Sequence, residues 1–129
     1  MTDARVSWDR PDRAILAAGL GVLAAGLIAR IGRQRRVYSF RNRSVVITGG
    51  ARGFGFALAR RLAREGARLS LVARTRSELE RARFQLQARG ADVAIFECDV
   101  RDETAVRHAI EQVVGQRGRL DVLVNNAGV

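Results

Sequence analysis

The stretch VVITGGARGFGFALARRL, residues 45–62, joins a short β-branched run to a helical pattern through a cluster of glycines. The run up to Thr48 is typical of a buried strand, and a helix is expected to begin near Gly55. Glycines lack a Cβ atom, so they allow a tight turn and let a ligand approach the backbone closely. The N–H groups and the dipole at a helix N-terminus attract an anion. The stretch therefore predicts a site for the diphosphate of a nucleotide, with a glycine-rich structural turn as the alternative.

Outward from this junction, residues 43–129 alternate strand-like and helix-like patterns. Three further strand-like runs follow, ARLSLVA, DVAIFEC and LDVLVNN, and helical patterns separate them. This order indicates parallel strands joined by right-handed crossovers. We predict an α/β fold with a Rossmann-type, doubly wound parallel sheet of about four strands, incomplete at the fourth strand. The strand order 3-2-1-4 of such a fold leaves that fourth strand at an edge.

Local patterns set the expected helix ends and part of the core. Gly66 and Gly90 stand where two of the helices are expected to stop. Ser77 with an acid three residues later has the spacing of a capping box, which predicts that the second helix begins at Ser77. Phe84 and Phe96 are expected in the core.

Residues 1–42 form a separate N-terminal segment with an apolar centre. No polar side chain occurs at positions 14–29, and the apolar character continues to Gly32. A helix over 14–29 reaches about 24 Å, against a hydrocarbon core of about 30 Å, although flanking arginines can extend its usable length. Basic residues without acids follow the run and favour a single-pass membrane anchor at 14–32 with the next domain on the cytoplasmic side. A cleaved signal peptide and a helix packed on the surface of a cytoplasmic protein are the alternatives.

The composition of the chain bears on which classes of ligand it is expected to bind. The formal net charge is +10, and every basic residue is arginine because the chain contains no lysine. No recognition motif or aromatic platform accompanies the arginines, so nucleic-acid binding is not predicted. Cys98, the only cysteine, follows a strand and is expected to be a packed side chain. His108 has no metal-ligand spacing around it, so no metal site is predicted.

Four motifs, taken in order, resemble the short-chain dehydrogenases/reductases. TGGARGFG (Thr48–Gly55) fits the T-G-x-x-x-G-x-G loop of that family, and CDV (Cys98–Val100) follows the third strand. GRLD precedes the fourth strand, and NNAG (Asn125–Gly128) ends it. The resemblance covers 43–129, the N-terminal cofactor-binding half, and fits the single-domain branch because Phe56 stands where the extended branch has glycine. It implies a nicotinamide dinucleotide cofactor and hydride transfer between that cofactor and a carbonyl or alcohol.

The residue after the second strand bears on which cofactor is bound. NAD-binding folds usually place an acid there to accept the ribose hydroxyls, whereas this chain has Arg74. An arginine would pair with the 2′-phosphate of NADP through charge-assisted hydrogen bonds. The resemblance places a second cation at Arg52. We predict NADP (NADPH), with NAD the less favoured cofactor; surface arginines in an arginine-rich chain are the alternative interpretation.

The resemblance also implies a role for each candidate site residue. The loop glycines would shape the phosphate turn, and the backbone beside them would contact the pyrophosphate and nearby ribose. An aspartate carboxylate and a valine amide would meet the adenine, and N-A-G would line the ribose and nicotinamide. Asn125 is expected to brace the sheet. The predicted cofactor-binding residues are Gly49, Arg52, Gly53, Phe54, Gly55, Arg74, Asp99, Val100, Asn126, Ala127 and Gly128.

No catalytic residue is predicted in this chain. The family's serine, tyrosine and lysine follow N-N-A-G, whereas the only tyrosine here, Tyr38, precedes the glycine loop. We expect a fragment, inactive alone and poorly soluble because of its exposed edge strand, of an NADP-dependent reductase acting on an unidentified carbonyl or alcohol. A non-catalytic, membrane-tethered nucleotide-binding or regulatory module is the alternative.

Overall fold

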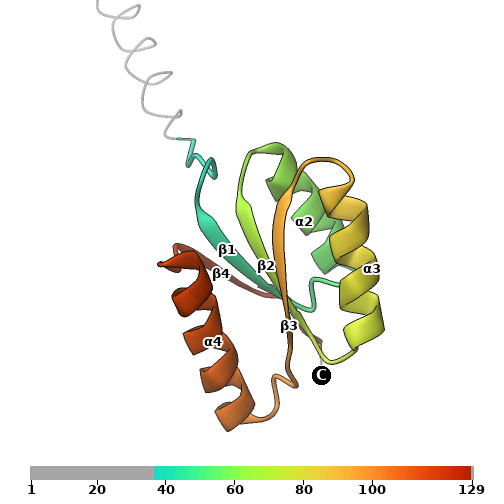
Figure 1. Cartoon of the computed structure of the whole chain (residues 1–129), viewed down its shortest axis with the longest axis vertical. Coiled ribbons are helices and arrows are strands. Elements are labelled where there is room, and N and C mark those ends of the chain that lie inside the picture. The colour runs from blue at the N-terminus through green and yellow to red at the C-terminus, as the bar shows by residue number, and fades with distance from the viewer. Residues whose placement is uncertain (1–36, 129) are drawn as a thin grey trace, which may run out of the picture. The chain divides into compact units, whose positions relative to one another are not determined.

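The computed structural model in Figure 1 describes residues 37–128, in which strands and helices alternate along the chain. The elements are β1 (Ser44–Thr48), α2 (Gly53–Arg64), β2 (Arg68–Ala73), α3 (Arg76–Gln87), β3 (Asp92–Glu97), α4 (Glu103–Arg117) and β4 (Val122–Asn125). All strand pairs are parallel, and the order across the sheet is β3-β2-β1-β4. The predicted α/β fold with a Rossmann-type parallel sheet is confirmed.

Helices cover both faces of the sheet, with α2 and α3 on one face and α4 on the other (Figure 1). The alternation of side chains along each strand supplies both cores. Val45 and Ile47 of β1 pack in the cluster that holds the apolar faces of α2 and α3, whereas Val46 packs with Val113 of α4. Because both faces of β1 and β2 are covered, successive residues of these strands are buried, including the polar Ser44 and Ser70. The edge strand β4 is less covered, and Leu123 on it is exposed.

Two helix starts differ from the sequence predictions. Helix α2 begins at Gly53, two residues before the expected position. Helix α3 begins at Arg76 with Thr75 as its N-cap and no side-chain cap, so the prediction of a capping box at Ser77 was wrong. The chain that leaves β2 stays extended only through Thr75, and Ser77 is already the second helical residue.

The two phenylalanines that were expected in the core have different environments. Phe96 of β3 is buried against α4, as predicted, whereas Phe84 of α3 is 75 % exposed. Helix α3 packs on the sheet through Leu79, Ala82 and Leu86, which recur at spacings of three and four residues. Phe84 lies two residues from Ala82, which turns it away from that face.

The predicted single-pass membrane localisation requires correction. Among residues 37–128, no helix combines the length and the apolar character that crossing a bilayer requires. The apolar segment 14–32, on which the anchor prediction rested, lies outside the described residues, as does most of the predicted segment 1–42.

Candidate functional site

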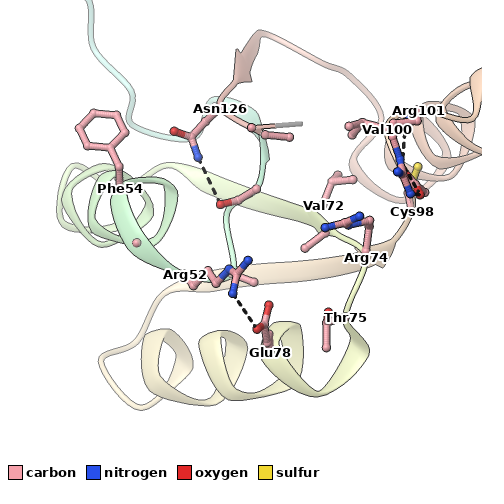
Figure 2. Close-up of a pocket in the computed structure, with 17 residues that line it drawn as sticks. Arg52, Phe54, Val72, Arg74, Thr75, Glu78, Cys98, Val100, Arg101 and Asn126 are labelled. Carbon is pink, nitrogen blue, oxygen red and sulfur yellow. Dashed lines mark hydrogen bonds and ion pairs between the residues drawn. The ribbon is translucent and has the colours of Figure 1, made fainter.

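A pocket of about 380 Å³ lies at the carboxyl edge of the sheet (Figure 2). Parallel strands end together at this edge, where open α/β sheets bind their ligands. The loop from β1 to α2, the end of β2, the first turn of α3 and the segments after β3 and β4 form its wall. Ten of the eleven candidate residues line it: Gly49, Arg52, Gly53, Phe54, Arg74, Asp99, Val100, Asn126, Ala127 and Gly128.

The eleventh candidate, Gly55, is buried in α2 and does not line the pocket. A Cβ atom on Gly55 would lie 2.2 Å from the carbonyl oxygen of Gly49. Gly49 and Gly53 have φ values of +65° and +55°, which residues other than glycine rarely adopt. The three glycines therefore permit the tight turn that brings the start of α2 to the edge of β1.

The N-terminus of α2 is left open toward this pocket. Its N-cap residue, Arg52, makes no side-chain cap hydrogen bond, and the first turn contains no acid. Helix α4 differs, because the Asp102 carboxylate accepts from the N–H groups of Thr104 and Ala105 at 2.9 and 3.1 Å. The first N–H groups of a helix have no partner within the helix. At α2 they are therefore available to an anion.

The hydroxyl of Thr48 connects the glycine loop to the segment after β4. It accepts from the N–H groups of Asn126 and Ala127 at 3.0 and 3.2 Å. The Asn126 amide also donates to the Gly49 carbonyl oxygen at 3.3 Å (Figure 2). Asn126 thus makes a bracing side-chain contact, while Asn125, for which bracing was expected, ends β4 opposite Thr48 and is exposed. The sequence indicates Thr48 as the strand end and as the first residue of the T-G-x-x-x-G-x-G loop, but it does not predict this contact.

Three arginines and two acids are among the residues that line the pocket. Arg52 and Glu78 form an ion pair with 3.5 Å between Nη1 and Oε1. Arg101 binds both carboxylate oxygens of Asp99, with Nη2 at 2.6 Å from Oδ2 and Nε at 3.0 Å from Oδ1. Arg74 makes no hydrogen bond or ion pair with any residue in the described range. Of the three arginines on the wall, it is the one whose guanidinium is not already bound to an acid.

The environment of Asp99 holds it in the charged form. Hydrogen bonds from the Arg101 side chain and backbone lower its pKa well below the usual range, and the charge of Arg74 adds to that effect. An adenine amino group at Asp99 would therefore share a carboxylate that Arg101 already holds. Burial, with the charges of Asp102 and Asp99, raises the pKa of the Cys98 thiol. Cys98 is accordingly a packed thiol and not an activated nucleophile.

Two charged residues of the pocket wall, Glu78 and Arg101, were not predicted from the sequence. Arg101 could have been found, because it lies two residues after Asp99 and can reach back to it. Glu78 could not, because its position in the pocket depends on where α3 begins. A metal centre has no candidate within residues 37–128, where no group of three or more potential ligands comes together.

Comparison with known proteins gives one family. The sequence model described as short chain dehydrogenase matches residues 43–129. The curated protein 3-dehydrosphinganine reductase TSC10A of Arabidopsis thaliana is 49 % identical over 90 residues, which are 69 % of this chain and 26 % of that protein. The chain thus spans about a quarter of the length of this relative.

Solved structures of similar proteins share the fold of this chain and differ from one another in the cofactor that they bind. A metagenomic short-chain oxidoreductase in complex with NADP has a TM-score of 0.67 and 38 % identity, covering 70 % of this chain and 41 % of that one. An NAD⁺-bound xylitol dehydrogenase has a TM-score of 0.68 and 36 % identity, covering 70 % of this chain and 35 % of that one. The likeness therefore extends to relatives with either cofactor.

Proposed function

The chain belongs to the short-chain dehydrogenase/reductase family of oxidoreductases, and from that premise we propose that its pocket binds NADP. The dinucleotide would lie along the carboxyl edge of the sheet, with its diphosphate at the start of α2. The glycine loop and the amides of Gly53 and Phe54 would hold that diphosphate. The N-A-G segment after β4 would line the nicotinamide side.

The open N-terminus of α2 is the observation that carries this proposal. A diphosphate needs hydrogen-bond donors without competing side chains, and α2 has neither a side-chain cap nor an acid in its first turn. The missing Cβ atoms of Gly49 and Gly55 leave the loop narrow and its backbone accessible. The pocket volume of about 380 Å³ lies within the common range for small-molecule sites, about 300–1,000 Å³.

The preference for NADP over NAD rests on Arg74. It lines the pocket after β2, where an NAD-binding site usually has an acid that accepts the ribose hydroxyls. Its guanidinium makes no ion pair with the described residues, so a 2′-phosphate would meet a cation that no acid holds in direct contact. Arginine suits that role because it can donate two parallel hydrogen bonds to phosphate oxygens.

For the whole protein we propose reversible hydride transfer between NADP and a small carbonyl or alcohol compound. NADP, when bound, supplies the hydride acceptor or donor. The described residues contribute binding and orientation of that cofactor. Proton transfer at the substrate needs an acid–base group, and the pocket wall offers none that suits it. Cys98 is a buried thiol, Asp99 is bound by Arg101, and Glu78 is paired with Arg52. We therefore expect cofactor binding without turnover from residues 1–129 alone.

Titration of NADPH and NADH into the 129-residue chain by calorimetry tests the proposal. We expect tighter binding of NADPH, and we expect Arg74→Asp to lower the ratio of NADPH to NADH affinity by about tenfold or more, because a charge-assisted pair becomes a repulsion. Arg89→Asp is the matched control, since Arg89 is exposed after α3 and does not line this pocket. An unchanged ratio in Arg74→Asp would contradict the NADP assignment, and no binding of either cofactor would contradict the function.

A further inference from the structure

The three arginines on the pocket wall are not equivalent in their partners. Asp99 binds Arg101 through both carboxylate oxygens, and Glu78 forms an ion pair with Arg52 at 3.5 Å. Arg74 has no acidic partner within the described residues. Two of the three cations are thus already neutralised by acids on the wall of the same pocket.

Figure 2 shows the pair between Arg52 and Glu78, whose two side chains differ in exposure. Glu78 lies in the first turn of α3, where the helix dipole favours a negative charge, and its side chain is 28 % exposed. The Arg52 side chain is 78 % exposed, on the loop that precedes α2. Because Glu78 is the more enclosed member, we expect a ligand that displaces the pair to move Arg52 and to leave the carboxylate in place.

We propose that Glu78 is a specificity-determining residue that restrains Arg52 and so reduces the advantage of a 2′-phosphorylated cofactor. The proposal rests on the proposed function, in which this pocket holds the adenosine end of a nicotinamide dinucleotide. A phosphate monoester carries nearly two negative charges at neutral pH and must compete with Glu78 for the Arg52 guanidinium. A cofactor with a free 2′-hydroxyl makes no such demand on Arg52.

The expected size of the effect follows from the exposure of the pair. Single-contact ion pairs that are open to solvent are weak and are screened by salt, so phosphate can outcompete Glu78 at modest cost. Removing the carboxylate charge should therefore tighten NADPH binding by roughly two- to fivefold at low ionic strength. NADH affinity should change by less than about twofold, and the gain for NADPH should shrink as salt is added.

The test is Glu78→Gln in the 129-residue chain, with NADPH and NADH affinities measured by calorimetry at low and high salt. Adenosine 2′,5′-bisphosphate and adenosine 5′-monophosphate serve as a second pair of probes, because they differ only in the 2′-phosphate. Glu80→Gln is the matched control, since Glu80 lies on the same helix, pairs with Arg76 and Arg83, and does not line the pocket. It should leave the cofactor ratio unchanged.

A second variant tests whether Glu78 acts through Arg52. In an Arg52→Gln background, Glu78→Gln should lose most of its effect on NADPH affinity, because the restrained side chain is absent. If Glu78→Gln still tightens NADPH binding by the full factor in that background, the proposal that Glu78 restrains Arg52 is wrong. An unchanged or weakened affinity for NADPH in Glu78→Gln alone, or an equal gain for both cofactors, overturns the specificity role. If the wild-type chain binds neither cofactor, the proposed function itself fails.

Discussion

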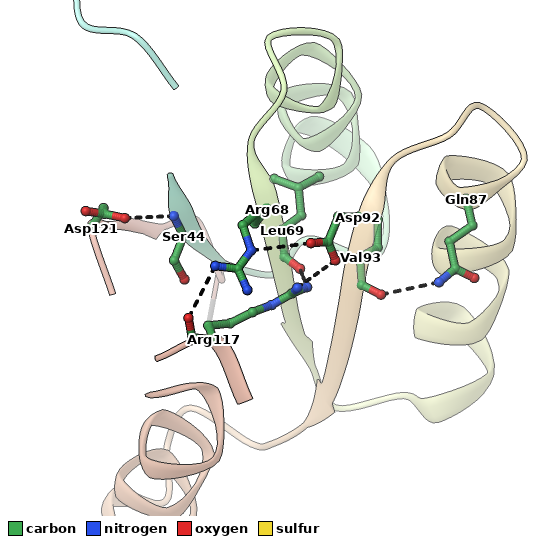
Figure 3. A network of polar contacts seen from close by, with 8 residues as sticks. All are labelled: Ser44, Arg68, Leu69, Gln87, Asp92, Val93, Arg117 and Asp121. Atoms are coloured by element: carbon green, nitrogen blue, oxygen red, sulfur yellow. Dashed lines mark hydrogen bonds and ion pairs between the residues drawn. The ribbon is translucent and has the colours of Figure 1, made fainter. Parts of the chain in front are cut away.

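The backbone N–H and C=O groups at the carboxyl edge of the sheet, where the strands end, have different partners from those at the amino edge, where the strands begin. At the carboxyl edge, the turn after β1 holds Gly49 and Gly53 at positive φ, and the N-terminus of α2 has no side-chain cap. At the amino edge, arginine and aspartate side chains bind the backbone directly (Figure 3).

Arg117, at the end of α4, is the centre of the contacts at the amino edge. Its guanidinium donates to the Leu69 carbonyl oxygen at 2.7 Å and to Asp92 Oδ1 at 2.6 Å. Arg68 contacts both partners of that ion pair, with 3.4 Å to Asp92 Oδ2 and 3.3 Å to the Arg117 carbonyl oxygen. The Asp121 carboxylate accepts from the N–H of Ser44 at 2.8 Å. Charged side chains thus stabilise the fold at one edge, while the other edge keeps its N–H donors for a ligand.

The largest expected effect comes from closing the carboxyl edge with one methyl group. Gly55→Ala places a Cβ atom 2.2 Å from a backbone oxygen that cannot move independently. We expect a loss of about 3 kcal/mol in the free energy of unfolding and at least tenfold weaker NADPH binding, measured by urea denaturation and calorimetry. Gly115→Ala in α4 is the control, because a Cβ there meets nothing within 4 Å and alanine favours a helix. A variant as stable as wild type would show that the turn is not tightly packed.

A smaller loss is expected at the amino edge, without an effect on the cofactor. Arg117→Met keeps much of the apolar stem but removes the donors to Leu69 and Asp92, and the Arg117 side chain is only 8 % exposed. We expect about 2 kcal/mol of destabilisation, since the Leu69 carbonyl oxygen loses this donor and the Asp92 carboxylate keeps only its contact with Arg68. The loss is moderated because Arg117 Nε has no hydrogen-bond partner in the described structure.

Arg107→Met is the control for Arg117→Met, because it removes an arginine charge from the same helix at an exposed position. Arg107 forms an exposed pair with Glu103 on the same helix, so its loss should cost less than about 0.5 kcal/mol. NADPH affinity should match wild type in both variants. Equal destabilisation by the two substitutions, or weaker cofactor binding in Arg117→Met, would remove the distinction between the two edges.

The sequence predicted the carboxyl edge better than the amino edge, for a physical reason. The requirements of the glycine loop are local, because a strand, a turn without Cβ atoms and a helix start follow each other directly. The contact between Arg117 and Leu69 joins residues 48 apart, and nothing in the sequence distinguishes Arg117 from the other arginines. Such a contact becomes visible only when α4 is packed on the sheet.

Errors of a few residues limited the prediction of the site itself. A capping pattern at Ser77 indicated the wrong first residue of α3, and the position of Glu78 depends on that start. Phe84 was assigned to the core for its apolarity, although the helical period places it toward solvent. Residue type therefore predicted the strands and the loop, while the directions of helix side chains required the structure.

The smallest expected effect concerns the response of the amino edge to acid. Hydrogen bonds from the Arg119 side chain and the Ser44 N–H, with the nearby charges of Arg119 and Arg43, lower the pKa of Asp121. A lowered pKa stabilises the fold above the unfolded value of about 4, and that contribution is lost as pH falls through the folded value.

Asp121→Asn should therefore be slightly less stable at pH 7 and lose less stability between about pH 5 and 3. The difference should shift the acid midpoint by less than about one pH unit, because other carboxylates with lowered pKa values, Asp92 and Asp99, still titrate. Urea denaturation across this pH range measures it, with the exposed Glu111→Gln on α4 as the control, and parallel acid slopes for wild type and Asp121→Asn would contradict it.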